Sequence, residues 1–177
     1  MNPNVIILYS SKTGFTKKYA ELLAAELGCT ALPLSATPAD LSQYDVAAFG
    51  SRLHAGSVDG WKKAQKLLVR RGAKKLALFA TGAMPNEAEA AIQAMWAQNL
   101  TPAEFTAIPH FYLPAGLCYE KMGAVDRAMM KLAAWAMTRK KAKSPEDEAF
   151  LAAIRRSYDI SDPKYIAPLA DCLRGMA

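Results

Sequence analysis

Unbroken hydrophobic runs of strand length occur three times in the first half of the chain, at residues 5–9, 46–49 and 76–80. Runs without polar alternation are typical of strands that are covered on both faces, as in a parallel sheet. Weaker strand signals lie at residues 32–34 and 105–113, and Pro109 makes the second of these interrupted or an edge strand. The pattern therefore predicts a sheet that is buried on both sides.

Helical periodicity fills the intervals between these runs. Apolar residues recur at helical spacing in residues 16–27 and 61–71, and a third helix is predicted over 86–98, opened by Pro85-Asn86. Strands that alternate with helices of this length imply right-handed crossovers and a parallel α/β sheet. The last third predicts helices only, at 122–139, from Ser144 to about 158, and from Asp162 to about 175. At 177 residues the chain is expected to be one domain.

Small residues follow each of the three strong strands. They are Ser10-Ser11, Gly50-Ser51 and Thr81-Gly82. The carboxyl ends of parallel strands share one edge of the sheet, and ligands of open α/β folds bind there. We therefore expect these corners to converge on one binding crevice.

The first corner has the composition of an anion-binding loop. Residues 9–16 read Tyr-Ser-Ser-Lys-Thr-Gly-Phe-Thr, directly after the first strand and at the start of the first helix. A helix N-terminus offers unpaired N–H groups and a partial positive charge, hydroxyls add donors, and Gly14 allows a tight turn. The segment is neither a Walker loop nor the glycine-rich dinucleotide turn. The alternative is an ordinary Ser/Thr-rich turn with a helix cap.

These residues resemble a known motif. Ser11-x-Thr13-Gly14-x-Thr16 after a first strand is similar to the FMN-phosphate loop of flavodoxins. The resemblance implies a doubly wound five-stranded parallel sheet of order 2-1-3-4-5, with helices on both faces, and here with extra C-terminal helices. It also implies that FMN binds at the strand ends. The phosphate ligands that it implies are Ser11, Lys12, Thr13, Gly14, Phe15 and Thr16.

A second resemblance extends to about residue 131. Gly50-Ser51-Arg52, Gly116-x-x-x-Tyr119 and Asp126-Arg127-x-Met129-Met130 are similar to segments of the flavodoxin-like protoporphyrinogen dehydrogenases. The flavin ring is then expected between two segments, formed by Gly50, Ser51, Arg52, Leu53, His54 and Ala55, and by Thr81, Gly82, Ala83 and Met84. Arg52 or His54 either meets the polar edge of the ring or is a solvated cation on a surface turn. Tyr119 either stacks on the flavin or packs within the inserted segment.

Two functions stay open on this evidence. One is an electron-transfer protein that docks redox partners, favoured because residues 81–85 lack the aromatic-rich, basic stretch of the dehydrogenases. The other is a dehydrogenase of protoporphyrinogen or a similar donor with a quinone acceptor, favoured by the basic composition and by Asp126-Arg127. In either case the flavin carries the electrons, so no catalytic side chain is predicted. The two histidines, His54 and His110, are too few for a histidine-based metal site.

The net charge of +6 comes entirely from residues 57–177. Residues 62–75 hold seven cations and no acid, and these cations are expected to point mostly to solvent. An acidic partner or an anionic membrane surface is a candidate for this basic face, whereas nucleic acid is not, because no aromatic residues are interleaved.

Localisation is predicted from the cysteines and from two absent signals. Three widely spaced cysteines, no signal-peptide pattern and no membrane span predict a cytoplasmic protein. Attachment to the inner face of the membrane is an open alternative, because residues 122–143 form either a helix packed across the sheet or a membrane-surface helix.

Overall fold

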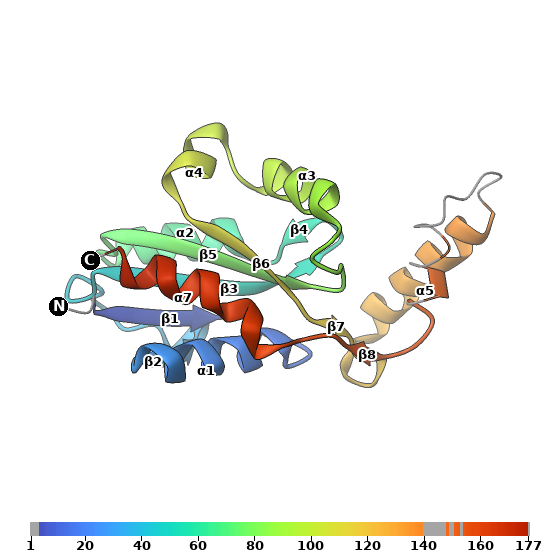
Figure 1. The fold of residues 1–177 in the computed structure, drawn as a ribbon, viewed down its shortest axis with the longest axis horizontal. Helices are drawn as coiled ribbons and strands as arrows, with labels where there is room; N and C mark the ends of the chain where they lie inside the picture. Colours follow the sequence, from blue (N-terminus) through green and yellow to red (C-terminus); the bar gives the residue numbers. More distant parts are fainter. Residues whose placement is uncertain (1–3, 140–147, 149–150, 153, 177) are drawn as a thin grey trace.

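The computed structural model describes residues 4–139, 148, 151–152 and 154–176, and its fold is shown in Figure 1. The strands are β1 (Val5–Tyr9), β2 (Thr30–Pro33), β3 (Val46–His54), β4 (Ser57–Val58), β5 (Lys75–Gly82), β6 (His110–Pro114), β7 (Gly116–Leu117) and β8 (Tyr158–Asp159). The helices are α1 (Phe15–Leu27), α2 (Trp61–Arg70), α3 (Glu89–Asn99), α4 (Pro102–Ala107), α5 (Ala124–Thr138) and α7 (Ala167–Arg174). Short 3-10 turns lie at Leu34–Ala36, Tyr119–Lys121 and Pro163–Ile166.

A five-stranded parallel sheet of order β2-β1-β3-β5-β6 forms the framework. This is the predicted doubly wound order, since β4 is only a short antiparallel addition to β3. The winding runs from β1 outward to β2 and then back through β3 to β6. The reversal lies between β1 and β3, where Tyr9 is in register with Gly50.

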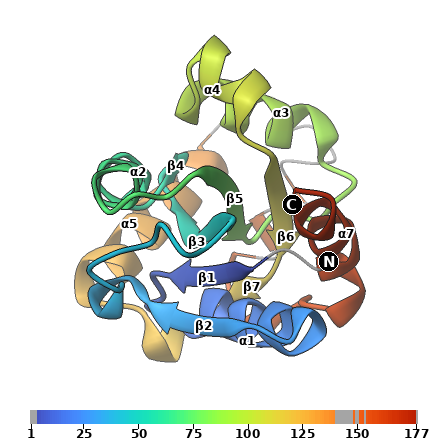
Figure 2. The same ribbon diagram turned by 90° about the vertical axis from the view of Figure 1, so that its left-hand side faces the viewer.

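Neighbouring residues of β1 point into two different cores, as the continuous apolar run predicts. Val5 and Ile7 pack with α1 and α7, whereas Ile6 and Leu8 pack with α2 and α3. All four side chains are at most 3% exposed. Figure 2 shows α1 and α7 on one side of the sheet and α2 on the other. Burial on both faces explains why β1 needs no polar alternation.

The strand predicted over residues 105–113 is wrong in its first half. Thr101 and Glu104 form a reciprocal capping box, in which the Thr101 hydroxyl accepts from the Glu104 N–H and the Glu104 carboxylate accepts from the Thr101 N–H. Pro102 occupies the first turn, where its missing N–H costs nothing. These features start α4, and the strand begins only at His110.

Other boundaries also differ from the sequence prediction. The third helix begins at Glu89 rather than at residue 86. Residues 50–54, expected as a loop, continue β3 and then turn back into β4 through Ala55 and Gly56. Tyr158 belongs to β8 rather than to the end of a helix. Seven of the fifteen residues of the helix expected over 144–158 lie outside the described residues.

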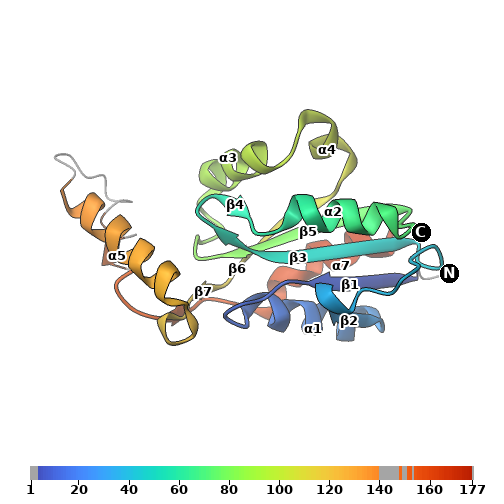
Figure 3. The ribbon, with the colours of Figure 1, turned by 180° about the vertical axis from the view of Figure 1, so that it is seen from behind.

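A long excursion leaves the sheet after β6 and returns before α7. Its two ends pair as the antiparallel ribbon β7–β8, with Gly116 opposite Asp159 and Leu117 opposite Tyr158. Helix α5 lies within this excursion and projects beyond the sheet (Figures 1 and 3). The interpretation of this segment as a helix packed across the sheet is therefore wrong.

Candidate functional site at the carboxyl edge of the sheet

The loop between β1 and α1 leaves several backbone donors open. Gly14 precedes α1 with φ 101° and ψ −20°, and no side chain caps this helix start. The first bond of the helix runs from the Lys18 N–H to the Gly14 carbonyl (2.9 Å), so the N–H groups of Phe15, Thr16 and Lys17 have no acceptor within the helix. An uncapped helix start of this kind binds anions well.

Hydrogen bonds bring the three predicted corners together. The Ser10 N–H donates to the carbonyl of Gly50 (2.9 Å), which joins the loop to β3. The hydroxyls of Thr16 and Thr81 lie 2.8 Å apart, which joins α1 to β5. The three corners therefore lie beside one another, as predicted, whereas a binding crevice shared by all three stays a prediction. Thr16 is only 1% exposed, so its hydroxyl faces Thr81 in the interior, and its open donor at the loop is the N–H.

The second predicted segment is a hairpin whose residues are mostly held by the protein itself. The Ser51 hydroxyl donates to the carbonyl of Asp59 (2.6 Å). A Cβ at Gly50 would lie 1.9 Å from Cζ of Phe79, so glycine is required here by internal packing. Ala55, at the turn, has φ 48°, a left-handed conformation that is uncommon for a residue with a side chain.

Arg52 and His54 both lie beside a carboxylate of the excursion. Arg52 Nη1 lies 2.6 Å from Asp126 Oδ2, and His54 Nε2 lies 3.1 Å from Asp126 Oδ1. Arg52 Nε also contacts Asp59 Oδ2 at 3.2 Å. The hydrogen bond from Arg52 holds the pKa of Asp126 below its usual range. The interpretation of Arg52 as a solvated cation is therefore wrong, because its hydrogen bond to Asp126 joins β3 to the first turn of α5. His54 lies beside the same carboxylate without a hydrogen bond to it.

Two tyrosines hold the third segment, which follows β5. The Tyr112 hydroxyl accepts from the N–H of Met84 (2.8 Å) and donates to the carbonyl of the same residue (3.0 Å). The Tyr158 hydroxyl donates to the carbonyl of Ala83 (2.8 Å). Burial raises the pKa of both phenols, so both stay protonated at neutral pH. The sequence pattern predicts neither tyrosine as a site residue, because each comes from a distant part of the chain.

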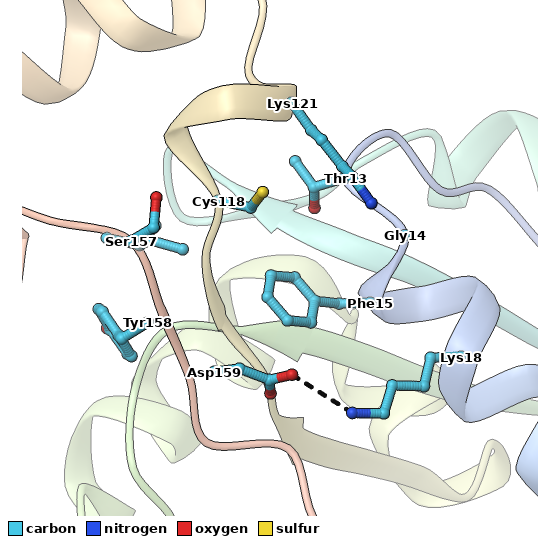
Figure 4. Close-up of a pocket in the computed structure, with 10 residues that line it drawn as sticks. Thr13, Gly14, Phe15, Lys18, Cys118, Lys121, Ser157, Tyr158 and Asp159 are labelled. Atoms are coloured by element: carbon cyan, nitrogen blue, oxygen red, sulfur yellow. Dashed lines mark hydrogen bonds and ion pairs between the residues drawn. The ribbon is translucent and has the colours of Figure 1, made fainter.

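A cavity of about 460 Å³ lies beside the anion-binding loop (Figure 4). Its lining residues are Thr13, Gly14, Phe15, Lys18, Leu117, Cys118, Lys121, Ser157, Tyr158 and Asp159. The cavity therefore joins the predicted loop to the β7–β8 ribbon, whose role the sequence does not reveal. Lys121 Nζ lies 3.8 Å from the position of a Cβ on Gly14, and Lys18 Nζ pairs with Asp159 at 3.3 Å. The ammonium of Lys121 makes this side of the loop favourable for an anion, whereas the charge of Lys18 is offset by Asp159.

Tyr119 is held within the excursion. Its N–H donates to the hydroxyl of Ser157 (2.9 Å), and its own hydroxyl donates to the carbonyl of Ile154. Burial raises the pKa of Tyr119. These contacts favour the packed role over stacking on a flavin.

The basic segment at residues 62–75 is less free than its sequence suggests. Six of its seven cations are exposed as predicted, and Arg71 is half-buried. Four have partners: Lys62 contacts Glu104 (2.7 Å), Arg71 the carbonyl of Pro38 (2.9 Å), Lys74 Asp45 (3.8 Å) and Lys75 the carbonyl of Met176 (2.7 Å). The absence of acids within the run therefore does not leave all of its cations unpaired. Lys63, Lys66 and Arg70 make no ion pair with any residue that the structure describes.

Two other kinds of site are absent from the described residues. No group of three histidine, cysteine or carboxylate side chains there is placed to hold a metal ion. In the same part of the chain, no helix combines the length and the apolar character needed to cross a bilayer.

Comparison with known proteins identifies the family. A family model described as a flavodoxin domain matches residues 6–144. The chain belongs to the flavodoxin-domain family. The match covers β1 to β7 and most of the excursion, and it supports FMN as the cofactor of a flavodoxin-domain protein with this loop.

Solved structures with a similar fold are distant from this flavodoxin-domain protein. A flavodoxin from the domain Archaea is 15% identical, with 71% of this chain and 89% of that chain covered and a TM-score of 0.40. A flavoprotein in complex with FMN from Lactobacillus acidophilus NCFM is 16% identical, with coverages of 63% and 92% and a TM-score of 0.41. A flavodoxin, WrbA-like protein from Agrobacterium tumefaciens is 17% identical, with coverages of 78% and 99% and a TM-score of 0.39. Such distant similarity carries no argument about the site. No curated protein matches the chain.

Proposed function

We propose that this protein binds one FMN non-covalently at the carboxyl edge of its sheet and transfers electrons between redox partners. The observation that carries the proposal is the uncapped start of α1, where Gly14 lies in the left-handed region and three N–H groups lack an acceptor within the helix. A phosphate accepts hydrogen bonds from such donors in a charge-assisted way. FMN, when bound, supplies the redox chemistry that no side chain of this site provides.

The residues present fit the phosphate of this cofactor. Ser11 and Thr13 are half-buried at the loop and add hydroxyl donors, although the Ser11 hydroxyl already accepts from the Gly14 N–H at 3.2 Å. Lys121 contributes positive charge over Gly14. The hairpin of residues 50–55 and the segment of residues 81–84 border the same edge and are expected to flank the ring. Both are held by the protein's own hydrogen bonds, so they are organised before a ligand arrives.

The cofactor assignment is tested by comparing FMN with riboflavin. Each charge-assisted phosphate bond is worth roughly 1.5–3 kcal/mol, so FMN is expected to bind at least about tenfold more tightly than riboflavin. The affinities are measured by quenching of flavin fluorescence in titrations of the apoprotein. Equal affinities would show that the loop does not hold the phosphate.

A second function, dehydrogenation of protoporphyrinogen or a similar donor with a quinone acceptor, is favoured by one observation. Asp126 of the excursion accepts a hydrogen bond from Arg52 at the carboxyl end of β3, so the excursion is attached to the edge where the flavin is proposed. A tied excursion restricts which molecules reach that edge, as an enzyme with a defined substrate requires. Turnover of protoporphyrinogen with a quinone tests this function, and its absence in an FMN-loaded preparation leaves the electron-transfer role.

The proposed setting is the cytoplasm, with an acidic redox protein or a quinone as partner. The α2 cations Lys63, Lys66 and Arg70 are the free part of the basic face through which such a protein docks. Exposed charges act mainly on encounter rates and are screened by salt. The triple change of these residues to Gln is expected to slow electron exchange with the partner at low salt, with FMN affinity unchanged. A rate equal to that of the wild type at every ionic strength would eliminate this face as the docking site.

A further inference from the structure

Helix α5 exposes an apolar stripe that no described part of the protein covers. Val125, Met129, Leu132 and Trp135 are 72%, 42%, 63% and 51% exposed. Their spacings of four, three and three residues place them along one face of the helix. Large apolar side chains scattered singly on a surface are common, but a continuous row of four on one helix indicates an interaction surface.

Two of the three charged residues of α5 are cations, and a third cation follows the helix directly. Arg127 and Lys131 are exposed, and Arg139 follows the helix with its guanidinium 4.1 Å from the centre of the Trp135 ring. The single acid of the helix, Asp126, is paired with Arg52 and so does not offset these cations. A tryptophan with a cation beside it suits the boundary between apolar and aqueous phases, because its ring is apolar and its N–H is polar.

We propose that the apolar stripe of α5 lies flat on an anionic lipid surface, with Val125, Met129, Leu132 and Trp135 in the acyl boundary and the cations against the headgroups. A surface-lying helix combines such an apolar face with lysine and arginine, and each cation near an anionic surface contributes about 1 kcal/mol. At 15 residues the helix is about 22 Å long, too short to span a bilayer of about 30 Å. The helix therefore lies in the surface rather than across it.

A second copy of the chain is a poorer occupant of this stripe. In a symmetric dimer the same patch meets itself, so Lys131 and Arg139 of both copies would face one interface without acids to pair with them. Four side chains on one helix also offer far less than the roughly 800 Å² per partner of a stable interface. Anionic lipid, by contrast, complements both the apolar row and the charge.

The experiment is co-sedimentation of the purified protein with vesicles, carried out with and without added FMN. One vesicle type is phosphatidylcholine alone, and the other contains roughly a third phosphatidylglycerol, which supplies the negative surface charge. We expect binding to the anionic vesicles and at least about tenfold weaker partition to phosphatidylcholine alone. Trp135 reports the contact directly, because the other two tryptophans, Trp61 and Trp96, are each only 2% exposed and do not reach the vesicle surface. The fluorescence emission of Trp135 is expected to shift to the blue when the protein binds.

Two sets of variants separate the stripe from other exposed residues. The double change Val125→Gln and Leu132→Gln is expected to lower partition to anionic vesicles at least about tenfold, because both side chains lose their transfer into the lipid. The matched control is Val69→Gln, an exposed valine of α2 (60%), which is expected to bind as the wild type does. Glutamine is a good helix former, so both variants keep their helices. Changing Lys63, Lys66 and Arg70 of α2 to Gln tests whether the other basic face causes the binding.

Each outcome decides the proposal. Loss of binding in the stripe variant alone supports it. Unchanged binding of the stripe variant, loss only in the α2 variant, or equal binding to both vesicle types overturns it. A dimer in light scattering that becomes a monomer in the stripe variant, without vesicle binding by the wild type, also overturns it in favour of a second copy. FMN titration of the same preparations keeps the outcome separate from the proposed function, since the docking does not require the cofactor.

Discussion

Replacing Gly14 with alanine tests the anion-binding loop without filling space. An added Cβ would meet only Lys121 Nζ, at 3.8 Å, so no clash is introduced. The backbone is the obstacle, because φ 101° is a conformation that side-chain-bearing residues rarely adopt. We expect Gly14→Ala to lower the free energy of unfolding of the apoprotein by about 1–2 kcal/mol.

Gly14→Ala is also expected to weaken FMN binding, by an effect separate from the loss of stability. A shift of the Gly14 backbone misplaces the N–H groups at the start of α1, and loss of one charge-assisted bond of about 1.5 kcal/mol weakens FMN binding roughly tenfold. Riboflavin, which lacks the phosphate, is expected to bind the variant and the wild type equally. Urea denaturation of the apoprotein and flavin titrations measure the two quantities separately.

Gly28 provides the matched control. It ends α1 in the left-handed region with φ 65°, a Cβ added to it would have no neighbour within 4 Å, and it lies at the other end of the same helix. Gly28→Ala is expected to cost about 1 kcal/mol of stability and to leave FMN affinity unchanged. The reasoning is refuted if Gly14→Ala and Gly28→Ala change FMN affinity equally, since the effect would then be one of stability and not of the loop.

Three further changes test individual contacts of the structure. Thr16→Val removes the hydrogen bond to buried Thr81 and is expected to lower stability by about 1–3 kcal/mol in a denaturation experiment, because one hydroxyl is left unpaired. Asp126→Asn weakens the contact with Arg52 and is expected to cost about 1–2 kcal/mol and to increase hydrogen exchange in α5, whereas unchanged exchange would show that the pair does not hold the helix. Hydrogen bonding, foremost from Lys62, lowers the pKa of Glu104 from 4.5 to about 2. The ionised carboxylate therefore stabilises the fold above pH 4.5, and this stabilisation is lost as the pH falls toward 2. Glu104→Gln is therefore expected to cost about 1 kcal/mol at pH 7 and almost nothing at pH 2, and an equal cost at both values would contradict the assignment.

The framework is predictable because its signals are local. The unbroken apolar run of β1 indicates burial on both faces, and the glycine and hydroxyl residues between β1 and α1 indicate an anion loop. The strand predicted over residues 105–113 fails for an equally local reason. The Thr101–Glu104 capping box marks a helix start, but the apolar residues that follow fit a strand as well as a helix in so short a run.

The rest of the site depends on contacts between distant residues, which local patterns do not report. Tyr158 reaches the carbonyl of Ala83 across 75 positions, and Arg52 reaches Asp126 across 74. Asp126 is singled out in the sequence only by the resemblance to the dehydrogenases, and that resemblance does not indicate that Asp126 pairs with Arg52. The same resemblance assigns Gly50 to the flavin, yet its lack of a side chain is already required by Phe79.

The ribbon β7–β8 brings the two ends of the excursion together at one place beside the sheet. Paired residues of such a ribbon lie only about 5 Å apart, so the chain leaves the sheet and returns to it at almost the same point. Gly116 permits this closeness, because a Cβ there would lie 2.1 Å from the carbonyl oxygen of Tyr158. Residues 118–157 can consequently change in length or content during evolution without altering the registration of the parallel strands. The same parallel sheet can thus carry excursions that differ in length and in surface.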